Sequence, residues 1–243
     1  MILDILWQEK AADEMERFLC QFFDKPEINR IGSLLNPETI DIYSDVDLEV
    51  YLQSNEILNV QLLLSNLSIQ FGDIFGYEVI TNPSNTVIRI VFNSFEAFDL
   101  TINHDTLPIS LLNNTYDERV TNTIMQFWHI AYKVVIKLGR NDYLIASHLA
   151  LELCQLIIVI QMLERDENEN TNFHRFGNKE DVPFLHNLIY TGIHNWIHCK
   201  QDEILSVLFE ATEYLDKTLN EKRIETTNHS KLKLFAEKLL QYQ

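Results

Sequence analysis

The chain contains few glycines, prolines and cysteines for its length. Its 243 residues include 6 Gly, 5 Pro and 3 Cys. So few glycines and prolines argue against long disordered linkers. The three cysteines, Cys20, Cys154 and Cys199, are too widely spaced for a zinc motif and odd in number, so they predict no disulfide framework. We expect Cys20 and Cys154 to be small core residues in a reducing cytoplasm.

Basic residues are also scarce. There are 19 Lys and Arg against 36 Asp and Glu, which gives a net charge of −17. Residues 1–116 carry 18 acidic and 5 basic residues, a balance of −13, whereas residues 117–243 carry 18 and 14, a balance of −4. Nucleic-acid binding relies on Lys and Arg that neutralise phosphates, so we expect no nucleic-acid partner. Cationic small molecules would be attracted, although an acidic balance can also serve solubility alone.

The sequence shows no sign of a targeting or membrane-spanning segment. Residues 1–4 carry an acid instead of the basic residues that begin a signal peptide. The most apolar window, residues 144–163, is about as long as a membrane span. It contains Ser147, His148 and Glu152, however, so we expect a buried helix of a cytoplasmic protein and no membrane partner.

Among the features that are present, the alternation of residues 43–50 carries the most chemistry. Polar and apolar residues alternate there with the period of a half-buried strand, so Asp45, Asp47 and Glu49 share one face. The apolar face must be buried, which turns the carboxylates outward. Neighbouring carboxylates repel, and a divalent cation relieves that repulsion. The run therefore predicts a metal-binding strand; the alternative is a solvated acidic strand edge.

Two further features complete the predicted metal site. Gly32 and Ser33 stand at a strand-to-helix turn, where glycine allows close approach of a ligand and the serine hydroxyl and backbone N–H groups suit a phosphate. Asp99 lies on the polar face of the alternating run 98–102 and offers a third carboxylate. The predicted site thus combines a phosphate-binding turn with an acidic trio that holds Mg²⁺.

The pattern of elements predicts an α+β chain. We expect a helix over 4–24, a strand over 27–32, the metal strand over 41–51, a helix over 57–71 and strands over 77–81, 86–92 and 95–102. This mixed-sheet domain occupies residues 1–105. Beyond it, residues 106–243 have helical period, with helices expected over 118–138, 141–165, 182–198, 201–220 and 229–241 and an exposed loop over 166–179. That part predicts an antiparallel helical bundle.

The ordered set Gly32, Ser33, Asp45, Asp47 and Asp99 resembles the nucleotidyltransferase superfamily typified by DNA polymerase beta. The resemblance covers residues 28–103. It implies a catalytic N-terminal domain followed by a helical substrate-binding domain. It also implies Mg²⁺ as cofactor and ATP as nucleotide donor, with Asp45, Asp47 and Asp99 as metal ligands.

A narrower resemblance is to the aminoglycoside 6-adenylyltransferases, the streptomycin-modifying enzymes of antibiotic resistance. It rests on Asn36-Pro37 after the Gly-Ser turn, on the run 41–47, on Phe127-Trp128, and on Lys137 with Arg140. It fades after about residue 160. One departure is Leu34, because those enzymes usually carry Arg directly after Gly-Ser, where it is presumed to contact phosphate.

This resemblance implies transfer of AMP from ATP to a hydroxyl of a small, cationic acceptor with release of pyrophosphate. Gly32 and Ser33 would bind the β- and γ-phosphates, and Lys137 or Arg140 could reach the triphosphate; the alternative is exposed helix charges. His148 and Glu152 lie at i and i+4 on one polar stripe, and His148 suits a general base. The alternative is a solvent-facing stripe or a core hydrogen-bonded pair.

Other functions stay open at this stage. The chain could be a nucleotide-binding regulatory module that lost turnover, as Leu34 in place of Arg would allow. It could also be a nucleotidyltransferase directed at a lincosamide or at a protein. The sequence indicates neither the hydroxyl that is modified nor the oligomeric state.

Overall fold

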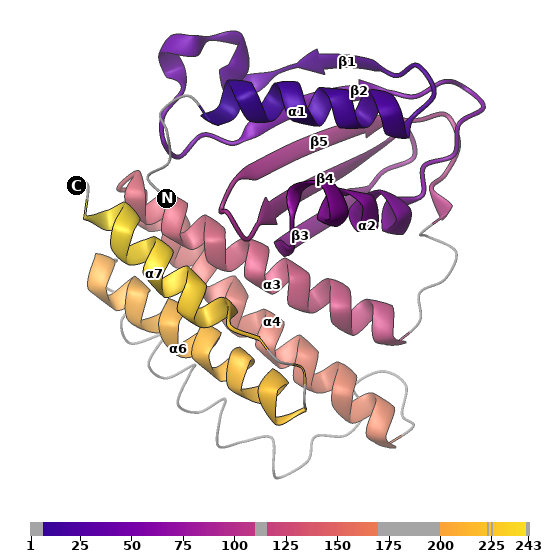
Figure 1. The fold of residues 1–243 in the computed structure, drawn as a ribbon. Coiled ribbons are helices and arrows are strands. Elements are labelled where there is room, and N and C mark those ends of the chain that lie inside the picture. Colours follow the sequence, from indigo (N-terminus) through magenta and orange to yellow (C-terminus); the bar gives the residue numbers. More distant parts are fainter. Residues whose placement is uncertain (1–6, 110–115, 170–199, 223, 225, 242–243) are drawn as a thin grey trace. The chain divides into compact units, whose positions relative to one another are not determined.

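The chain folds into an α/β unit followed by a helical unit, as the α+β prediction requires. A computed structural model describes residues 7–109, 116–169, 200–222, 224 and 226–241 (Figure 1). The contact pattern divides the chain into Met1–Thr115 and Tyr116–Gln243. The last strand ends at Asn103 and the first helix of the second unit begins at Tyr116, on either side of the division that the sequence places after residue 105.

The described part of the first unit holds five strands, two α-helices and two short 3-10 helices. In chain order, they are α1 (Trp7–Phe22), β1 (Glu27–Arg30), η1 (Gly32–Leu35), η2 (Pro37–Thr39), β2 (Val46–Tyr51), α2 (Val60–Phe71), β3 (Ile74–Thr81), β4 (Asn85–Phe92) and β5 (Ala97–Asn103). Each strand and α-helix predicted from the hydrophobic pattern of residues 7–109 is confirmed, with bounds shifted by a few residues.

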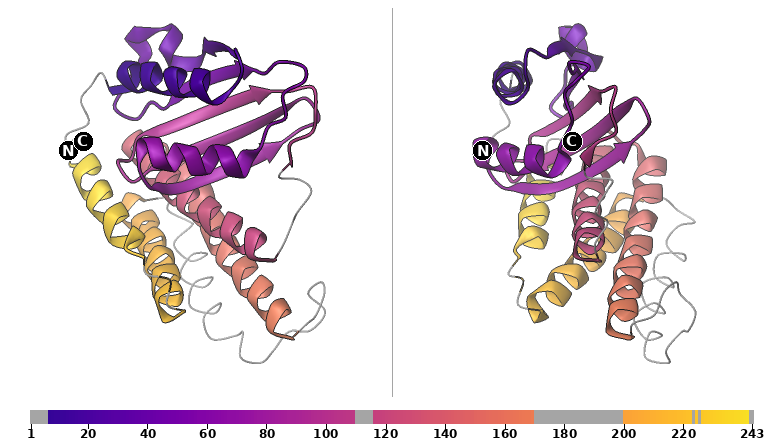
Figure 2. Two further views of the ribbon diagram at one scale, coloured as in Figure 1. Left: turned by 45° about the vertical axis from the view of Figure 1, so that its right-hand side comes forward. Right: turned by 90° about the vertical axis from the view of Figure 1, so that its right-hand side faces the viewer.

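The five strands form one mixed sheet in the order β1-β2-β5-β4-β3. β2 and β5 run parallel, and all other neighbours are antiparallel. Helices α1 and α2 cover the same face of this sheet (Figures 1 and 2). On that face, the ring of Phe98 in β5 packs against Trp7 of α1 and Phe71 of α2.

Alternation along β2 and β5 separates the core from the polar face. The fully buried apolar residues of these strands are Val46, Leu48, Val50, Phe98, Leu100 and Ile102. Burying each such side chain stabilises the fold by roughly 1.5–3 kcal/mol. Because successive side chains of a strand point to opposite faces, Asp47 and Asp99 lie on the face that α1 and α2 leave uncovered.

Residues 41–44 form a turn, although the sequence predicts a strand from residue 41. β2 begins only at Val46. The backbone N–H of Ser44 donates to the carbonyl of Asp41 at 3.1 Å, and the Asp41 carboxylate accepts from the N–H of Tyr43 at 2.9 Å. An aspartate that bonds the backbone two residues on favours a turn over a strand, and this local chemistry prevails here over the alternating pattern.

Two other local predictions were wrong. Cys20 is exposed, because it shares the outer face of α1 with Asp13 and Arg17, whereas Cys154 is buried as expected. Helix α4 continues to Glu169, through the start of the expected loop. The remainder of that loop, Cys199 and the helix expected over 182–198 lie outside the described residues.

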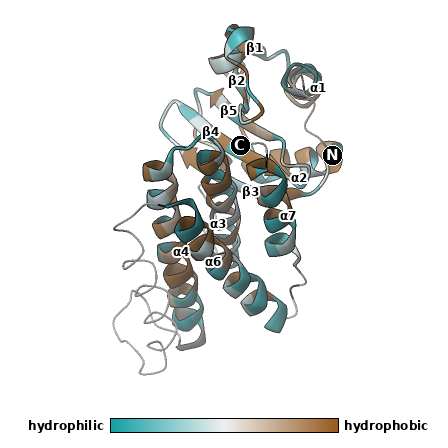
Figure 3. Ribbon diagram, turned by 90° about the vertical axis from the view of Figure 1, so that its left-hand side faces the viewer, coloured by the Kyte–Doolittle hydropathy of each residue, from teal (hydrophilic) through white to brown (hydrophobic). Residues whose placement is uncertain are grey.

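The described part of the second unit is helical throughout. Its helices are α3 (Tyr116–Gly139), α4 (Tyr143–Glu169), α6 (Gln201–Glu221) and α7 (Asn228–Leu240). α4 packs against α3 and α6, and α7 packs against α3 and α6. Much of α3 and α4 consists of hydrophobic residues, drawn in brown in Figure 3. The short connections between α3 and α4 and between α6 and α7 make each pair an antiparallel hairpin.

Helix α4 is long and apolar enough to cross a membrane over Tyr143–Arg165. Of its most apolar window, 44% is buried inside the protein. The core helix of a soluble protein meets the same criteria of length and composition, and Leu153 and Ile157 of α4 are buried in the helical unit. The packing of α4 therefore accounts for part of its apolar character.

Candidate active site

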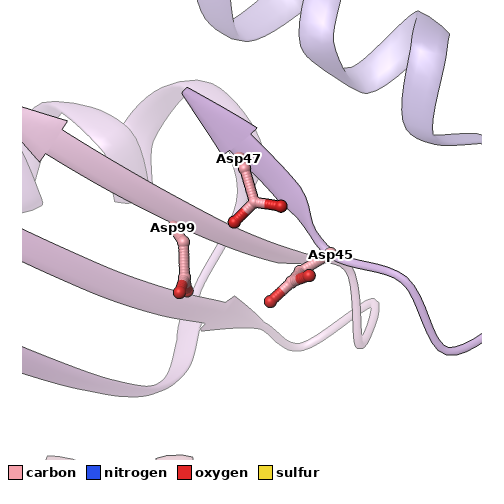
Figure 4. Close-up of side chains that lie close together, drawn as sticks. All are labelled: Asp45, Asp47 and Asp99. Carbon is pink, nitrogen blue, oxygen red and sulfur yellow. The ribbon is translucent and has the colours of Figure 1, made fainter. Parts of the chain in front are cut away.

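Three carboxylates converge on the face of the sheet opposite α1 and α2. Asp45 directly precedes β2, Asp47 lies in β2 and Asp99 lies in β5. Asp47 and Asp99 are paired in the parallel register of the two strands. One oxygen from each of the three carboxylates lies within 4.8 Å of the others, and all three residues are half-buried (Figure 4). The structure thus brings together the three acids that the sequence predicts as a group.

This arrangement is electrostatically unfavourable for Asp47. Burial, together with the nearby charges of Asp45 and Asp99, raises the pKa of its carboxyl from 3.8 to about 7. Arg89 opposes the shift. Near neutral pH, the three carboxylates therefore resist being ionised together unless a cation neutralises them.

Gly32 lies directly against the Asp47 side chain. Its φ of +61° is a backbone conformation that glycine adopts readily. A Cβ atom at this position would lie 2.2 Å from Asp47 Oδ2, which no real side chain tolerates. The neighbouring backbone N–H of Ile31 donates to the carbonyl of Asp47 at 3.1 Å. The Gly-Ser turn therefore packs directly against Asp47 of β2.

The hydroxyl of Ser33 is the second feature of this turn. Ser33 lies in η1, and its Oγ is buried without a hydrogen-bond partner in the structure. A buried hydroxyl without a partner destabilises a fold by roughly 1–3 kcal/mol and calls for an explanation. A phosphate oxygen held at the turn would supply the missing partner. Leu34, where the resembling enzymes carry Arg, is half-buried.

Arg89 is a site residue that the sequence did not reveal. Its Nε donates to Asp99 Oδ2 at 3.2 Å, and its Nη1 donates to Glu78 Oε2 at 2.9 Å. In the strand register, Glu78 pairs with Arg89, Arg89 with Asp99, and Asp99 with Asp47, so these four charged residues form one row across β3, β4, β5 and β2. Arg89 thus partly balances the acidic trio.

The acidic trio fits a small, hard divalent cation. Mg²⁺ prefers oxygen ligands and usually binds through one or two carboxylates together with water and substrate phosphates. Asp45, Asp47 and Asp99 supply only carboxylate oxygens, and the turn at Gly32–Ser33 lies beside them. Glu49, one step further along β2, instead accepts a hydrogen bond from Asn103 Nδ2 at 3.2 Å.

The other predicted site residues belong to the second unit. On α4, His148 is exposed and Glu152 is half-buried. Lys137 is half-buried in the last turn of α3, and Arg140 is exposed in the turn that follows. A functional role for each of these four residues at the carboxylate site stays a prediction.

Comparison with known proteins adds little to this geometry. Neither a protein-family profile nor the sequence of a curated protein matches the chain. Among solved structures, the chain is similar to the GLD-2/RNP-8 complex at 15% identity with a TM-score of 0.31, covering 57% of this chain and 47% of that one. It is also similar to the Cid1 poly(U) polymerase at 14% identity with a TM-score of 0.30, covering 55% and 40%.

A third similar structure is the polymerase core of TRAMP, an RNA surveillance complex, at 15% identity with a TM-score of 0.33, covering 89% of this chain and 60% of that one. In each of these three comparisons, the matched part spans less than two thirds of the known structure. At TM-scores this low, the similarities carry no argument about this chain, and the candidate site stands on its own residues.

Proposed function

We propose that this protein is a Mg²⁺-dependent nucleotidyltransferase that moves AMP from ATP to a hydroxyl group. The observation that carries the proposal is the convergence of Asp45, Asp47 and Asp99 within 4.8 Å, beside the glycine-serine turn. In the reaction, the acceptor oxygen attacks the α-phosphorus and the bond to the bridging α–β oxygen breaks. Pyrophosphate leaves, and the hydroxyl proton passes to a base.

Phosphoryl transfer requires in-line positioning and neutralisation of charge more than covalent help from the protein. In this proposal Asp45, Asp47 and Asp99 hold the metal, which when bound neutralises phosphate charge and activates the acceptor oxygen. The raised pKa of Asp47 supports this assignment, because a trio that resists full ionisation by itself is one that a divalent cation stabilises.

The turn at Gly32–Ser33 is assigned to the β- and γ-phosphates. Its support is the buried Ser33 hydroxyl without a partner and the close approach of backbone that Gly32 permits. Lys137 and Arg140 are assigned to the triphosphate as further cations. The side chain of Leu34 cannot donate to a phosphate, so the turn would hold the triphosphate by Ser33 and by backbone N–H groups.

The base is assigned to His148, with Glu152 one helical turn away to orient it. An imidazole can accept a proton from a hydroxyl group as a general base. The support is chemical and local: the two side chains lie at i and i+4 on α4, and His148 is accessible to a ligand.

For the acceptor, we propose a small, hydroxylated, cationic molecule of the aminoglycoside class. The first 116 residues have a charge balance of −13, which attracts a cation and repels a polyanion. The local resemblance to aminoglycoside 6-adenylyltransferases supports the same class. A lincosamide, a protein or an RNA end is the alternative acceptor.

The decisive experiment is a pyrophosphate-release assay of the full chain with each NTP and Mg²⁺. The acceptors are a panel of aminoglycosides, lincosamides and a short RNA, and labelled ATP with cell lysate tests for a protein acceptor. Asp47→Asn should abolish release, while Asp105→Asn, at an exposed acid of the same unit, should keep it. ATP binding by calorimetry without release for any acceptor would instead identify a nucleotide-binding module without turnover.

A further inference from the structure

The backbone of Asp45 is not fixed by strand pairing, unlike that of Asp47 and Asp99. Asp47 and Asp99 are fixed by the parallel pairing of β2 and β5. That pairing begins with Val46 opposite Phe98, so Asp45 lies just before the ladder. The position of its carboxylate therefore depends on the turn of residues 41–44 that leads into it.

The turn is closed by side chains as well as by its backbone. The Ser44 hydroxyl donates to Asp41 Oδ1 at 2.8 Å and accepts from the N–H of Asp41 at 3.1 Å. Ser44 is 5% exposed, so its side of these bonds is buried, whereas Asp41 is exposed. The turn nevertheless belongs to no helix or strand, and it needs an anchor on a rigid element to keep Asp45 in place.

Gln8 provides that anchor from the first turn of α1. Its side-chain Nε2 donates to the carbonyl of Asp41 at 2.8 Å and to the carbonyl of Ser44 at 3.2 Å. The two N–H groups of one amide thus bind both ends of the turn. Gln8 is 1% exposed, and α1 packs on β2, so the anchor is buried and borne by a helix fixed to the same sheet.

The side-chain oxygen of Gln8 indicates that the N–H donors of this amide, and not its acceptor, explain a polar residue at this position. Gln8 Oε1 is buried and accepts no hydrogen bond in the structure. A buried acceptor without a partner destabilises a fold by roughly 1–3 kcal/mol, and an apolar side chain would avoid that loss. A polar side chain at this position is explained by the two carbonyls that it holds.

We propose that Gln8 is a positioning residue for Asp45 and, through it, for the divalent cation. The inference rests on the proposed function, because it assigns Gln8 a role at the same metal site. Groups that orient metal ligands commonly change metal affinity by 10–100-fold when they are removed. Gln8 acts indirectly, through the backbone of the turn, so we expect its removal to weaken metal affinity by about tenfold.

The test compares Mn²⁺ affinity of the full-length chain and its variants, measured from the free-Mn²⁺ signal in electron paramagnetic resonance. Gln8→Met removes both donors at similar volume. The control is Thr86→Val, which removes another fully buried hydrogen-bonding group of the first unit, one that lies 2.9 Å from His104 Nε2. Both variants should lose stability, but only Gln8→Met should weaken Mn²⁺ binding, by about tenfold.

Ser44→Ala opens the same turn from its other side and should also weaken Mn²⁺ binding, which keeps the test decisive if Gln8→Met does not fold. Wild-type Mn²⁺ affinity in folded Gln8→Met, wild-type affinity in Ser44→Ala where Gln8→Met does not fold, or an equal loss in Thr86→Val, would overturn the role of Gln8. These outcomes leave the proposed function intact. That function fails separately if the wild-type chain binds no Mn²⁺ or if Asp47→Asn binds it normally.

Discussion

Gly32 and Asp47 are so close that a Cβ atom at position 32 would lie 2.2 Å from Asp47 Oδ2. The φ of +61° at Gly32 adds a second restriction, because side chains disfavour that conformation. Two independent constraints thus select glycine where the Gly32–Ser33 turn meets Asp47 of β2. This contact ties the geometry of the turn to that of the carboxylate.

The first prediction concerns Gly32→Ala. The methyl group must displace the Asp47 carboxylate or the turn, so we expect Mn²⁺ affinity to fall at least tenfold and stability to fall by about 1–2 kcal/mol. The measurements are Mn²⁺ titration and urea unfolding of the full chain.

Gly72→Ala is the matched control for this prediction. Gly72 also has a positive φ, +97°, but a Cβ there meets nothing within 4 Å. It should lower stability through backbone strain and leave Mn²⁺ affinity unchanged. If the two variants bind Mn²⁺ equally well, the contact between Gly32 and Asp47 has no part in metal binding.

The second prediction concerns stability and pH in metal-free protein. The pKa of Asp47 is raised from 3.8 to about 7 in the folded state, so folding binds a proton between these values. Its favourable contribution is present below pH 3.8 and is lost as the pH rises through about 7. Asp47→Asn should therefore be more stable than wild type at pH 8, by about 1–2 kcal/mol after allowance for solvent screening of a half-exposed group.

Urea unfolding in EDTA at pH 4 and pH 8 measures this difference. At pH 4 the two proteins should have nearly the same stability, because wild-type Asp47 is then protonated when folded. Asp105→Asn, at an exposed carboxyl, should show no such pH-dependent gain. A wild type more stable than Asp47→Asn at pH 8 without metal would contradict the strained-carboxylate account.

The third prediction concerns Arg89, which bonds both Asp99 and Glu78. Arg89→Met leaves two partly buried carboxylates without this partner, so we expect stability to fall by about 1–3 kcal/mol. It also removes the Arg89 hydrogen bond to Asp99 and a positive charge beside the three carboxylates. Mn²⁺ binding should therefore become several-fold tighter at low ionic strength, as Mn²⁺ titration would measure.

Arg30→Met serves as the control, because Arg30 also pairs with two acids, Asp13 and Glu16, but on α1 and β1 rather than beside the trio. It should leave Mn²⁺ affinity unchanged. Weaker Mn²⁺ binding in Arg89→Met would mean that Arg89 chiefly positions Asp99 and does not compete with the cation.

The fourth prediction concerns the proposed base. His148→Ala should lower the rate of nucleotidyl transfer by about 100-fold or more while leaving Mn²⁺ affinity unchanged, because general bases contribute about 10²–10⁴ to rate. Gln155→Ala, at an exposed position further along the same stripe of α4, is the control and should keep most activity. An equal, small effect of both substitutions would remove His148 from the mechanism.

Much of the site could be predicted because its chemistry follows local patterns. Alternation alone places Asp45 and Asp47 on one face and shows Asp99 as a polar position between apolar ones. Arg89 has the same local pattern, yet its role depends on the register of β3, β4 and β5, which is set by the whole sheet. A single sequence does not reveal that register.

Gln8 shows a second limit of sequence reasoning. It is a polar residue in the first turn of an amphipathic helix and looks like a surface position, but it is 1% exposed because it meets the turn that leads to Asp45. Its partners lie 33 and 36 residues away in the chain. The turn itself was predicted as strand, because the alternating pattern extends into it while the side-chain bonds of Asp41 set its conformation.

The most direct test of the central claim is a crystallographic anomalous difference map of the full chain with Mn²⁺ and ATP. The account predicts a manganese peak within coordination distance of carboxylate oxygens of Asp45, Asp47 and Asp99, with the triphosphate at the Gly32–Ser33 turn. A peak at another site, or bound nucleotide with no metal at the three carboxylates, would contradict it.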